Sequence, residues 1–457
     1  MTAQLENQRV VSSLKKHYGV DLRYAGPGER ARFAKRLAKK AGVPRSVVNF
    51  AILNAGPFRP SPGASRNALL LHSAGELLLQ TDDDTVCKVA DVPDSSPGLT
   101  LTSRPDPTQF WFFPDRDSAM NSVQFVQRDF LALHESLLGR DLASCISSIR
   151  SDGDWNIDTL GGDFLRRAED GSGRILATSA GIVGDSGMRR TCFYLFYGKP
   201  SFTRLTESEQ KYRAAMASQQ VLRAVTRSTV SGGGHCSAGN LGLDNRRLLP
   251  PFMPLQKGED TIFGKLLFGC FADAFVGFLP WALAHLSPGE ARPDDRNERI
   301  YGDAHDFLSA IITSFHDSNG LLPQACCAES QLTRLGKYLV DLAAASASDF
   351  RETVRTIAWR SAASRLDRLE KHLKTQTPHV DYWENDLACL LNRYRKSLIE
   401  ENYDAPSDLL TVDNDDKARR LFKELVSQFG YLLQYWPQMV AATVELRQSG
   451  DLLAPPG

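Results

Sequence analysis

The sequence predicts an α/β domain, built on a mostly parallel sheet, followed by an all-helical region. Between residues 20 and 81, short apolar runs alternate with amphipathic stretches of about 12 residues, which is the spacing of parallel strands joined by crossover helices. Beyond residue 304 the apolar residues recur mostly at helical spacing, and strand patterns are scarce. The chain has 457 residues, more than one hydrophobic core usually covers, which favours two domains.

In the N-terminal part, helices and strands are expected to alternate. Amphipathic spacing predicts helices at residues 7–17, Glu29–Lys40 and Arg66–Ala74. Short apolar runs predict strands at Val20–Tyr24, Val47–Leu53 and Glu76–Thr81. A Gly-Pro-Gly sequence at residues 26–28 predicts the turn that closes the first of these strands.

The middle of the chain combines loops with further regular elements. Turn-forming residues predict irregular backbone at Asp91–Pro107, Ser151–Gly173 and Ser231–Asn240. Helical spacing predicts helices at Gln127–Ser148 and Ser208–Ser228. An apolar run predicts a strand at Arg174–Ile182, and prolines, which fix φ, predict a rigid extended segment at Leu248–Pro254.

One segment, Ile262–Leu286, is long and apolar enough to be weighed as a membrane span. Lys265, Asp273 and Pro280 interrupt it, and an aspartate near the middle of a membrane helix costs about 2.5–3.5 kcal/mol. We therefore interpret the segment as a buried helix and turn, and we expect no transmembrane segment.

Two domains are expected, a sheet domain at residues 1–290 and a helical domain at 300–450. The polar residues 288–299 predict a linker between them. The clearest helices of the second domain are predicted at Ser348–Lys374, Asp381–Ile399 and Asp415–Leu446. This helical domain is a candidate for acceptor binding or for an oligomer contact.

Charge and composition argue against several classes of protein. Lys+Arg and Asp+Glu both number 54, so the net charge is zero, which disfavours a nucleic-acid binder that relies on a basic surface. The first residues contain no apolar signal region, so we expect a cytoplasmic location. The eight cysteines lack Cys-x-x-Cys spacing and are expected to be reduced.

The strongest candidate for chemistry is the run Asp82-Asp83-Asp84, which directly follows a predicted strand. Adjacent carboxylates repel one another and raise each other's pKa. A divalent cation relieves that repulsion, and hard oxygen ligands suit Mg²⁺ or Mn²⁺. Two alternatives remain open: an acidic turn without function, and a competing metal site at Asp115 and Asp117.

The sequence SRNALLLHSAGELLLQTDDD, which ends at Asp84, resembles the nucleotide-sugar-binding half of GT-A glycosyltransferases, particularly the family-2-like group. Those enzymes carry an Ala-Arg-Asn helix and then a strand that ends in an Asp-x-Asp type motif. The resemblance implies that Asp82 and Asp84 hold Mn²⁺ or Mg²⁺ on the diphosphate of a UDP- or GDP-sugar donor, where the metal stabilises the leaving group. It also implies that Arg66, Asn67 and Asp83 contact the donor.

Glu259 and Asp260 precede an apolar helical pattern, and the same family places a Glu-Asp pair at a helix start in its acceptor half. The resemblance implies that Asp260 is the general base for the acceptor hydroxyl, with Glu259 as its neighbour. Either residue could instead cap the helix, because a helix N-terminus favours carboxylates.

Two further groups of residues belong to the expected site. Asp244, Asn245 and Arg246 are expected to contact the acceptor, and a turn held by Asx hydrogen bonds is the alternative. By the same resemblance, His285 is a third ligand for the metal or the diphosphate, although a lone His on an apolar segment is more often a core residue. His235 and Cys236 are too few for a zinc site.

The resemblance covers about residues 20–290 and predicts a metal-dependent glycosyltransferase of GT-A fold. Two features depart from the family. Its first strand, whose end holds the nucleotide base, is not visible in residues 1–19, and Asp84 and Asp260 lie about 175 residues apart, which implies an insertion. A nucleotidyltransferase and a non-catalytic scaffold of GT-A shape are the alternative interpretations.

Overall fold

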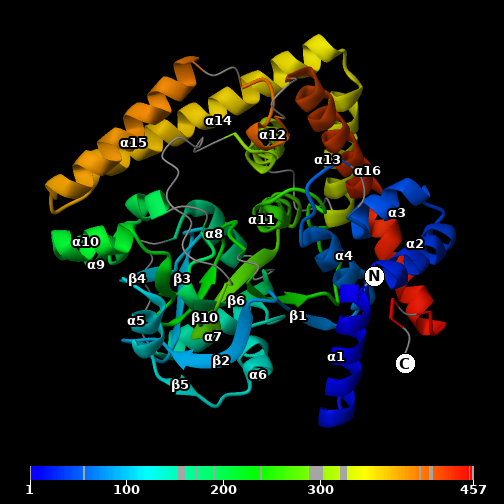
Figure 1. The fold of residues 1–457 in the computed structure, drawn as a ribbon, viewed down its shortest axis with the longest axis horizontal. Coiled ribbons are helices and arrows are strands. Elements are labelled where there is room, and N and C mark those ends of the chain that lie inside the picture. The colour runs from blue at the N-terminus through cyan, green and yellow to red at the C-terminus, as the bar shows by residue number, and fades with distance from the viewer. Residues whose placement is uncertain are drawn as a thin grey trace.

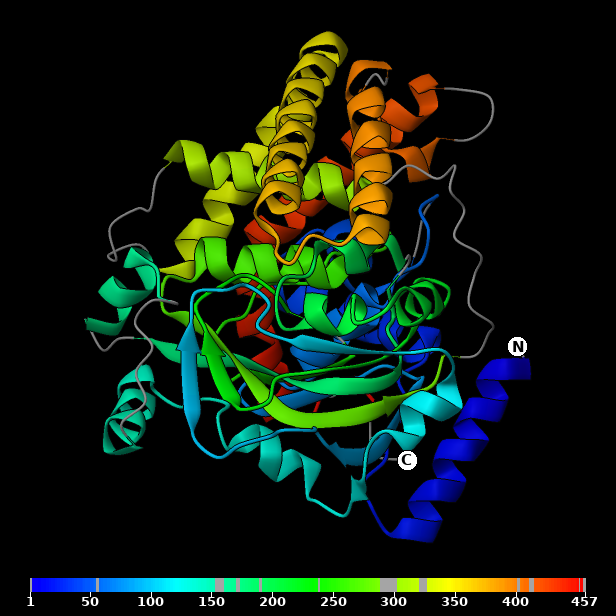
Figure 2. The same cartoon turned by 90° about the vertical axis from the view of Figure 1, so that its left-hand side faces the viewer.

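A computed structural model describes most of the chain. The described residues are 2–54, 57–152, 160–169, 173–188, 191–236, 239–287, 302–319, 327–400, 403–410, 415–451 and 453–454. They form a β-sheet with short helices around it and a layer of long helices, which lies above the sheet in both views (Figure 1, Figure 2). The protein is therefore an α/β structure with a helical C-terminal region, as the sequence predicts.

The described strands form one sheet. They are Leu77–Thr81 (β1), Thr85–Asp91 (β2), Leu99–Thr102 (β3), Gln109–Phe113 (β4), Phe125–Val126 (β5), Arg174–Asp185 (β6), Gln220–Ala224 (β7), Ser228–Ser231 (β8), Asn240–Asp244 (β9) and Ala274–His285 (β10). Their order is β1-β9-β6-β10-β2-β5, with β7 and β4 beyond β6 and with β8 and β3 beyond β10.

The sheet is mixed, so the expectation of a mostly parallel sheet is wrong for the described strands. Only β6 with β10 and β3 with β8 pair in parallel there, and the other pairs are antiparallel. The expectation failed because β7 and β9 lie in segments whose spacing predicts a helix and a loop. Both strands return antiparallel to their neighbours.

Strands β6 and β10 form the centre of the sheet, with 12 residues each, and nearly all of these residues are buried. Strand β6 confirms the strand predicted at Arg174–Ile182. The segment Ile262–Leu286 was interpreted as a helix and turn. Its residues up to Cys270 belong to the helix Glu259–Cys270 (α11), and its residues from Ala274 to His285 form β10. The helix and the turn are confirmed up to residue 273, and only the strand was missed, because a continuous apolar run does not distinguish a buried strand from a buried helix.

Only helices precede β1 among the described residues, which agrees with the missing first strand. They are Thr2–Tyr18 (α1), Pro27–Ala41 (α2), Arg45–Ile52 (α3) and Gly63–His72 (α4). The helices predicted at residues 7–17, Glu29–Lys40 and Arg66–Ala74 are confirmed by α1, α2 and α4. The predicted strand at Glu76–Thr81 is confirmed by β1.

Two predicted N-terminal strands are wrong. Val20–Tyr24 has no regular secondary structure, and Val47–Leu53 falls on helix α3. The buried side chains of α3 include Val47, Val48 and Ile52, and the helix packs against α2. Tertiary packing therefore outweighs the β-propensity of these side chains.

Short helices connect the strands between β4 and β9. They are Arg116–Asn121 (α5), Phe130–Glu135 (α6), Leu142–Asp152 (α7), Gly162–Glu169 (α8), the 3₁₀ helix Thr191–Phe196 (η2), Ser201–Leu205 (α9) and Glu209–Met216 (α10).

Several predicted boundaries in this middle region differ from the observed ones. The helix predicted at Gln127–Ser148 is divided by a turn at Gly139, whose φ of 74° favours glycine. The helix predicted at Ser208–Ser228 ends at Met216 and is followed by β7. The segments predicted as irregular at residues 91–107 and 151–173 contain β3 and α8.

The C-terminal region is helical, as predicted beyond Ala304. It contains Ala304–Asn319 (α12), Ala328–Ala344 (α13), Ala347–Thr375 (α14), Asp381–Glu400 (α15), the 3₁₀ helix Ser407–Leu409 (η3) and Asp415–Gln448 (α16). The linker predicted at residues 288–299 lies outside the described residues.

Helix α16 connects the C-terminal helices to the N-terminal ones. It packs along α13, where a Cβ on Gly336 would lie 2.6 Å from the Gly430 carbonyl oxygen, and it also contacts α2 and α3 (Figure 1). The Trp436 indole donates a hydrogen bond of 2.7 Å to the Leu249 carbonyl. One cluster of buried apolar side chains therefore includes residues from both predicted domains, such as Phe33 and Trp436.

Two negative findings concern the described residues. None of their helices combines the length and the apolar composition that crossing a bilayer requires. Their seven cysteines are all free thiols, as expected from the spacing of cysteines in the sequence.

Candidate functional site

The three adjacent aspartates form a tight turn between β1 and β2. The Asp82 amide donates to the Gly239 carbonyl (3.1 Å), the Thr85 amide donates to the Asp82 carbonyl (3.2 Å), and the Leu286 amide donates to the Asp84 carbonyl (2.8 Å). The turn leads the chain from the strand paired with β9 to the strand paired with β10. Backbone hydrogen bonds therefore fix Asp82 and Asp84 where two strands end.

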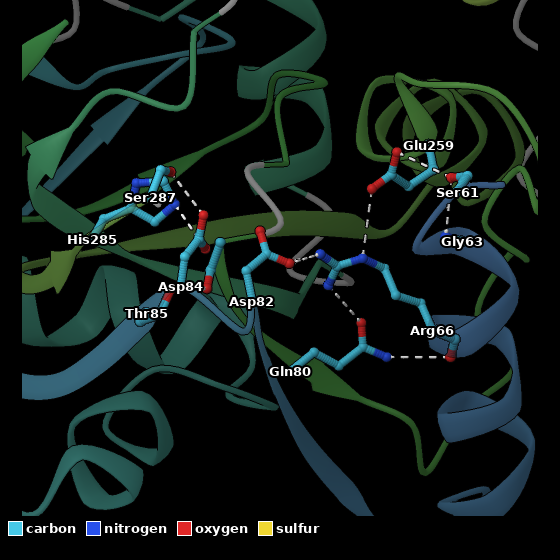
Figure 3. A network of polar contacts seen from close by, with 11 residues as sticks. Ser61, Gly63, Arg66, Gln80, Asp82, Asp84, Thr85, Glu259, His285 and Ser287 are labelled. Atoms are coloured by element: carbon cyan, nitrogen blue, oxygen red, sulfur yellow. Dashed lines mark hydrogen bonds and ion pairs between the residues drawn. The ribbon is translucent and has the colours of Figure 1, made fainter. Parts of the chain in front are cut away.

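Asp84 is brought into contact with His285, the last residue of β10 (Figure 3). The Nε2 atom of His285 lies 3.1 Å from Asp84 Oδ1, and its Nδ1 atom lies 2.7 Å from the Asp185 carbonyl oxygen. Ser287 Oγ donates a hydrogen bond of 2.8 Å to the other carboxylate oxygen of Asp84. The sequence prediction that His285 joins the acidic turn agrees with this geometry.

The tautomer of His285 follows from these contacts. A carbonyl oxygen only accepts hydrogen bonds, so Nδ1 carries the proton that it donates to Asp185. In the neutral ring, Nε2 then presents a lone pair to Asp84 Oδ1, which is buried and accepts no hydrogen bond in the structure. Two electron-rich atoms face each other, and a proton or a metal ion between them would satisfy both. Metal-binding histidines typically donate their other N–H to a carbonyl in this way.

Arg66 joins Asp82 to Glu259, which lies far away in the sequence (Figure 3). It forms an ion pair with Asp82, and its Nε lies 3.7 Å from Glu259 Oε1. The Arg66 side chain is almost fully buried and donates a hydrogen bond of 3.4 Å to Gln80 Oε1, and the Gln80 amide nitrogen donates one of 3.3 Å to the Arg66 backbone carbonyl. The structure therefore brings together three residues that the sequence analysis assigned to two halves of one site.

The electrostatic balance of this group leaves negative charge under-compensated. Burial raises the pKa of Asp82, and neighbouring Asp84 raises it further, while Arg66 and His285 oppose the change without cancelling it. Burial and the charge of Asp260 raise the pKa of Glu259 in the same way. A further cation would therefore be favourable beside these carboxylates.

Asn67 and Asp83 do not join this group through side-chain contacts. The Asn67 amide nitrogen donates to the Ala51 and Phe252 carbonyls at 3.0 Å and 2.9 Å, and its oxygen accepts from the Phe252 amide at 2.7 Å. These bonds occupy both N–H groups and make Asn67 a buried structural connection. Asp83 is exposed at the tip of the turn.

Asp260 lies in the first turn of α11, where its carboxylate accepts a hydrogen bond of 2.7 Å from the Thr261 amide. Its charge acts on three groups that surround it: Arg223, His235 and Cys236. Arg223 donates a hydrogen bond of 2.7 Å to His235 Nε2. The sequence analysis missed Arg223 and His235 as neighbours of Asp260, because only the fold brings β7 and the Gly-rich loop to the start of α11.

The residues expected on the acceptor side lie at the opposite end of β1 and β9 from Asp82. The Asp244 carboxylate accepts hydrogen bonds of 2.7 Å and 3.0 Å from Arg246 and of 3.0 Å from Arg174. Asn245 donates to the Leu70 carbonyl at 2.7 Å at the end of α4. The structure does not bring these residues together with Asp260.

Asp115 and Asp117, the competing metal site, lie at the start of α5. Asp115 accepts a hydrogen bond of 2.7 Å from the Ser118 amide, which lowers the pKa of Asp115. This contact is a helix N-cap and accounts for Asp115 without a metal ion.

The candidate metal site is a pair of side chains with a third beside it. No group of three or more His, Cys, Asp or Glu side chains that could hold a metal ion is found within the described part of the chain. Asp84 and His285 contact each other, whereas the Asp82 carboxylate is directed to Arg66. Comparisons with protein-family models, curated proteins and solved structures gave no match.

Proposed function

We propose that the protein is a metal-dependent glycosyltransferase, which moves a sugar from a nucleotide-diphospho-sugar to an acceptor hydroxyl. The observation that carries the proposal is the 3.1 Å contact between His285 Nε2 and Asp84 Oδ1. It places the imidazole Nε2 against a carboxylate oxygen that accepts no hydrogen bond, next to Asp82, so that a metal ion or a proton would bridge the two atoms. The resemblance of the preceding sequence to GT-A enzymes supplies the substrate class, a UDP- or GDP-sugar.

The residues present fit a divalent ion. Asp84 and His285 would supply a carboxylate and an imidazole ligand, and Asp82 lies beside them. An imidazole ligand favours Mn²⁺ over Mg²⁺. Such ions keep water molecules and bind substrate phosphates, so two protein ligands are sufficient. When bound, the ion would stabilise the negative charge of the diphosphate leaving group.

The chain's own residues prepare this site before any substrate binds. The Asp185 carbonyl fixes the tautomer of His285, and Ser287 holds the second oxygen of Asp84. Arg66 keeps Asp82 at the strand end by linking it to Glu259. Fixed donor and acceptor groups of this kind reduce the reorganisation that substrate binding would otherwise require.

In the proposed reaction, Asp260 is the general base. The acceptor oxygen forms a bond to the anomeric carbon, its proton moves to the Asp260 carboxylate, and the bond to the diphosphate oxygen breaks with its electron pair on the diphosphate. The Thr261 amide donates a hydrogen bond to the Asp260 carboxylate and so orients it. An ionised carboxylate is the state that can accept the proton.

Thermal unfolding with UDP- and GDP-sugars, in Mn²⁺ and in a chelator, tests donor binding. We expect stabilisation by one of these nucleotide sugars in Mn²⁺ alone, because a ligand at 100 times its Kd stabilises by about 2.7 kcal/mol. His285→Ala should abolish the shift. His17→Ala, at an exposed histidine of α1, is the matched control and should keep it. Wild-type protein that gives no metal-dependent shift with any nucleotide sugar contradicts the proposal.

Substitution of the general base tests the chemistry separately from binding. Asp260→Asn keeps the size of the side chain and its oxygen, so metal-dependent donor binding should remain. Transfer should fall by about 10²–10⁴-fold, because the amide does not accept the proton. A nucleotide sugar with a radiolabelled sugar measures release of the sugar from the donor and its transfer to the acceptor. Transfer at the wild-type rate would mean that Asp260 is not the general base.

A non-catalytic scaffold is the second candidate. It is favoured by the absence of any strand ahead of β1 in the described part of the chain, because GT-A enzymes hold the nucleotide base at that strand. The scaffold interpretation predicts that no nucleotide sugar binds. The same thermal-unfolding experiment therefore separates the two candidates.

A further inference from the structure

A cavity of about 720 Å³ lies between helices α11, α12 and α14. Its volume falls within the range of small-molecule sites, about 300–1,000 Å³. Thr261, which follows Asp260 in the sequence, is part of its wall. His305 of α12 also lines it and packs on Gly258, where an added Cβ would lie 2.5 Å from the imidazole. The cavity therefore begins at the N-terminal turn of α11 that carries Asp260.

The cavity wall is rich in hydroxyl groups. Ser309, Thr313 and Ser314 line it from α12, and Ser361 and Ser364 line it from α14. Apolar side chains are few, namely Phe193, Ala310 and Ile357. Hydroxyls both donate and accept hydrogen bonds, so this wall suits a ligand with many hydroxyl groups and does not suit an acyl chain.

Two buried polar atoms of the wall have no hydrogen-bond partner. They are Ser309 Oγ and His305 Nδ1. Buried polar groups are nearly always hydrogen-bonded in native proteins, and an exception requires an explanation such as a water molecule or a ligand. Protein atoms cover both of them, so they add polar groups to the interior of the wall and do not face the open part of the cavity.

The cavity wall carries both charges, with four lysine and arginine side chains and the three aspartates Asp303, Asp306 and Asp317. Lys265, Arg360 and Arg368 line it, and no ion pair involves them in the described part of the chain. Desolvation lowers the pKa of Lys265, the charges of Arg368 and Arg365 lower it further, and Asp317 opposes them. Arg365 itself approaches Asp306 at 3.6 Å. An anionic group near Lys265 and Arg368 would relieve this repulsion through charge-assisted hydrogen bonds.

We propose that this cavity is the acceptor subsite, and that the acceptor is a polyhydroxylated molecule that carries a phosphate or carboxylate group. The inference rests on the proposed function and adds the chemical class of the acceptor. The anionic group binds Lys265 and Arg368, and the acceptor's hydroxyls bind the serine and threonine side chains. In this assignment the reacting hydroxyl would lie at the end of the cavity formed by Thr261, which is the wall residue that follows Asp260 in the first turn of α11.

Saturation-transfer NMR with simple probes tests the binding chemistry in the whole protein. Glucose 6-phosphate and glucuronate should bind at millimolar concentration, and glucose should bind more weakly than both. Lys265→Ala combined with Arg368→Ala should weaken binding of the anionic probes at least about tenfold, because a hydrogen bond to a charged group contributes about 1.5–3 kcal/mol. Arg355→Ala, at an exposed arginine of α14 outside the cavity wall, is the matched control and should leave binding unchanged.

The outcomes separate this inference from the proposed function. Asp82→Ala combined with Asp84→Ala should abolish the nucleotide-sugar shift and keep probe binding, which would support two distinct subsites. If wild-type protein binds a nucleotide sugar but no anionic probe, or if the Lys265 and Arg368 substitutions change nothing, the acceptor assignment is overturned and the function stands. If the wild-type protein binds an anionic probe but no nucleotide sugar, the proposed function is contradicted. The acceptor assignment, which rests on that function, is then overturned as well.

Discussion

The paired strands β1 and β9 have Asp244 at one end and Asp82 at the other, and the pKa values of these two aspartates are shifted in opposite directions. Asp244, at one end, is completely buried, and Arg246 and Arg174 lower its pKa although burial alone would raise it. At the other end, burial and Asp84 raise the pKa of Asp82 although Arg66 contacts it. At Asp244 the neighbouring positive charges outweigh the effect of burial on the pKa, whereas at Asp82 they do not.

This difference separates a structural cluster from a candidate binding site. The carboxylate oxygens of Asp244 accept three hydrogen bonds from arginines, so a further ligand would have to displace protein contacts. Asp84 Oδ1 accepts none and faces His285 Nε2 at 3.1 Å. A cation bound at Asp84 Oδ1 would therefore displace no hydrogen bond that this oxygen accepts.

The largest effect on stability is expected at the Asp244 end. Asp244→Ala removes the shared partner of Arg246 and Arg174, and breaking a buried ion pair costs about 3–5 kcal/mol. Both arginines reach solvent, so we expect a loss near the lower limit, about 3 kcal/mol. Urea denaturation measures the change. The metal-dependent shift with nucleotide sugar should survive in this variant, and its loss would contradict the structural role.

Substitution of Asp84, at the other end, should change stability less than substitution of Asp244. Unlike the Asp244 substitution, it should abolish metal-dependent binding. Asp84→Ala removes a carboxylate that repels Asp82, so the apo protein should change by less than about 1 kcal/mol. The metal-dependent stabilisation of about 2.7 kcal/mol at 100 times the Kd should disappear. Thermal unfolding with and without Mn²⁺ measures both. A large loss of stability in the apo protein would mean that Asp84, like Asp244, is mainly structural.

The sequence predicted much of this arrangement because several signals are local. The helix before β1, the strand itself and the acidic turn lie within about 20 residues, and their order is visible as apolar spacing followed by Asp82-Asp83-Asp84. The contact between Asp84 and His285 was expected only through the family resemblance. It forms because β10 pairs with β2 at Thr85 and so ends beside the turn.

What the sequence did not reveal depends on long-range pairing. Asp244 and Asp82 look alike as aspartates next to apolar strands, and only the register of β1 with β9 places them at opposite ends. Arg223 and His235 are separated from Asp260 by strand β9 and by the buried segment that follows it. The spacing of residues in the sequence does not show which residues of two antiparallel strands face each other, because tertiary packing sets the register of the pair.

The smallest predicted effect is a difference in the pH dependence of stability between the two ends. The folded pKa of Asp82 is raised above 3.8, so the folded state holds the proton more tightly, and the contribution of Asp82 to stability falls as pH rises through that window. The folded pKa of Asp244 is lowered below 3.8, so its contribution is present above that value and is lost as pH falls.

Urea denaturation of the wild type, Asp82→Asn and Asp244→Asn between about pH 3 and pH 6 measures these trends. Subtracting the free energy of unfolding of each variant from that of the wild type removes the contribution of the other titrating groups. The Asp82 difference should fall with rising pH and the Asp244 difference should rise, so the two curves should have slopes of opposite sign. Mn²⁺ should reduce the slope for Asp82 alone, because a bound cation favours its ionised form. Slopes of the same sign would mean that both clusters already hold enough positive charge, and the argument for a metal ion at Asp84 and His285 would fail.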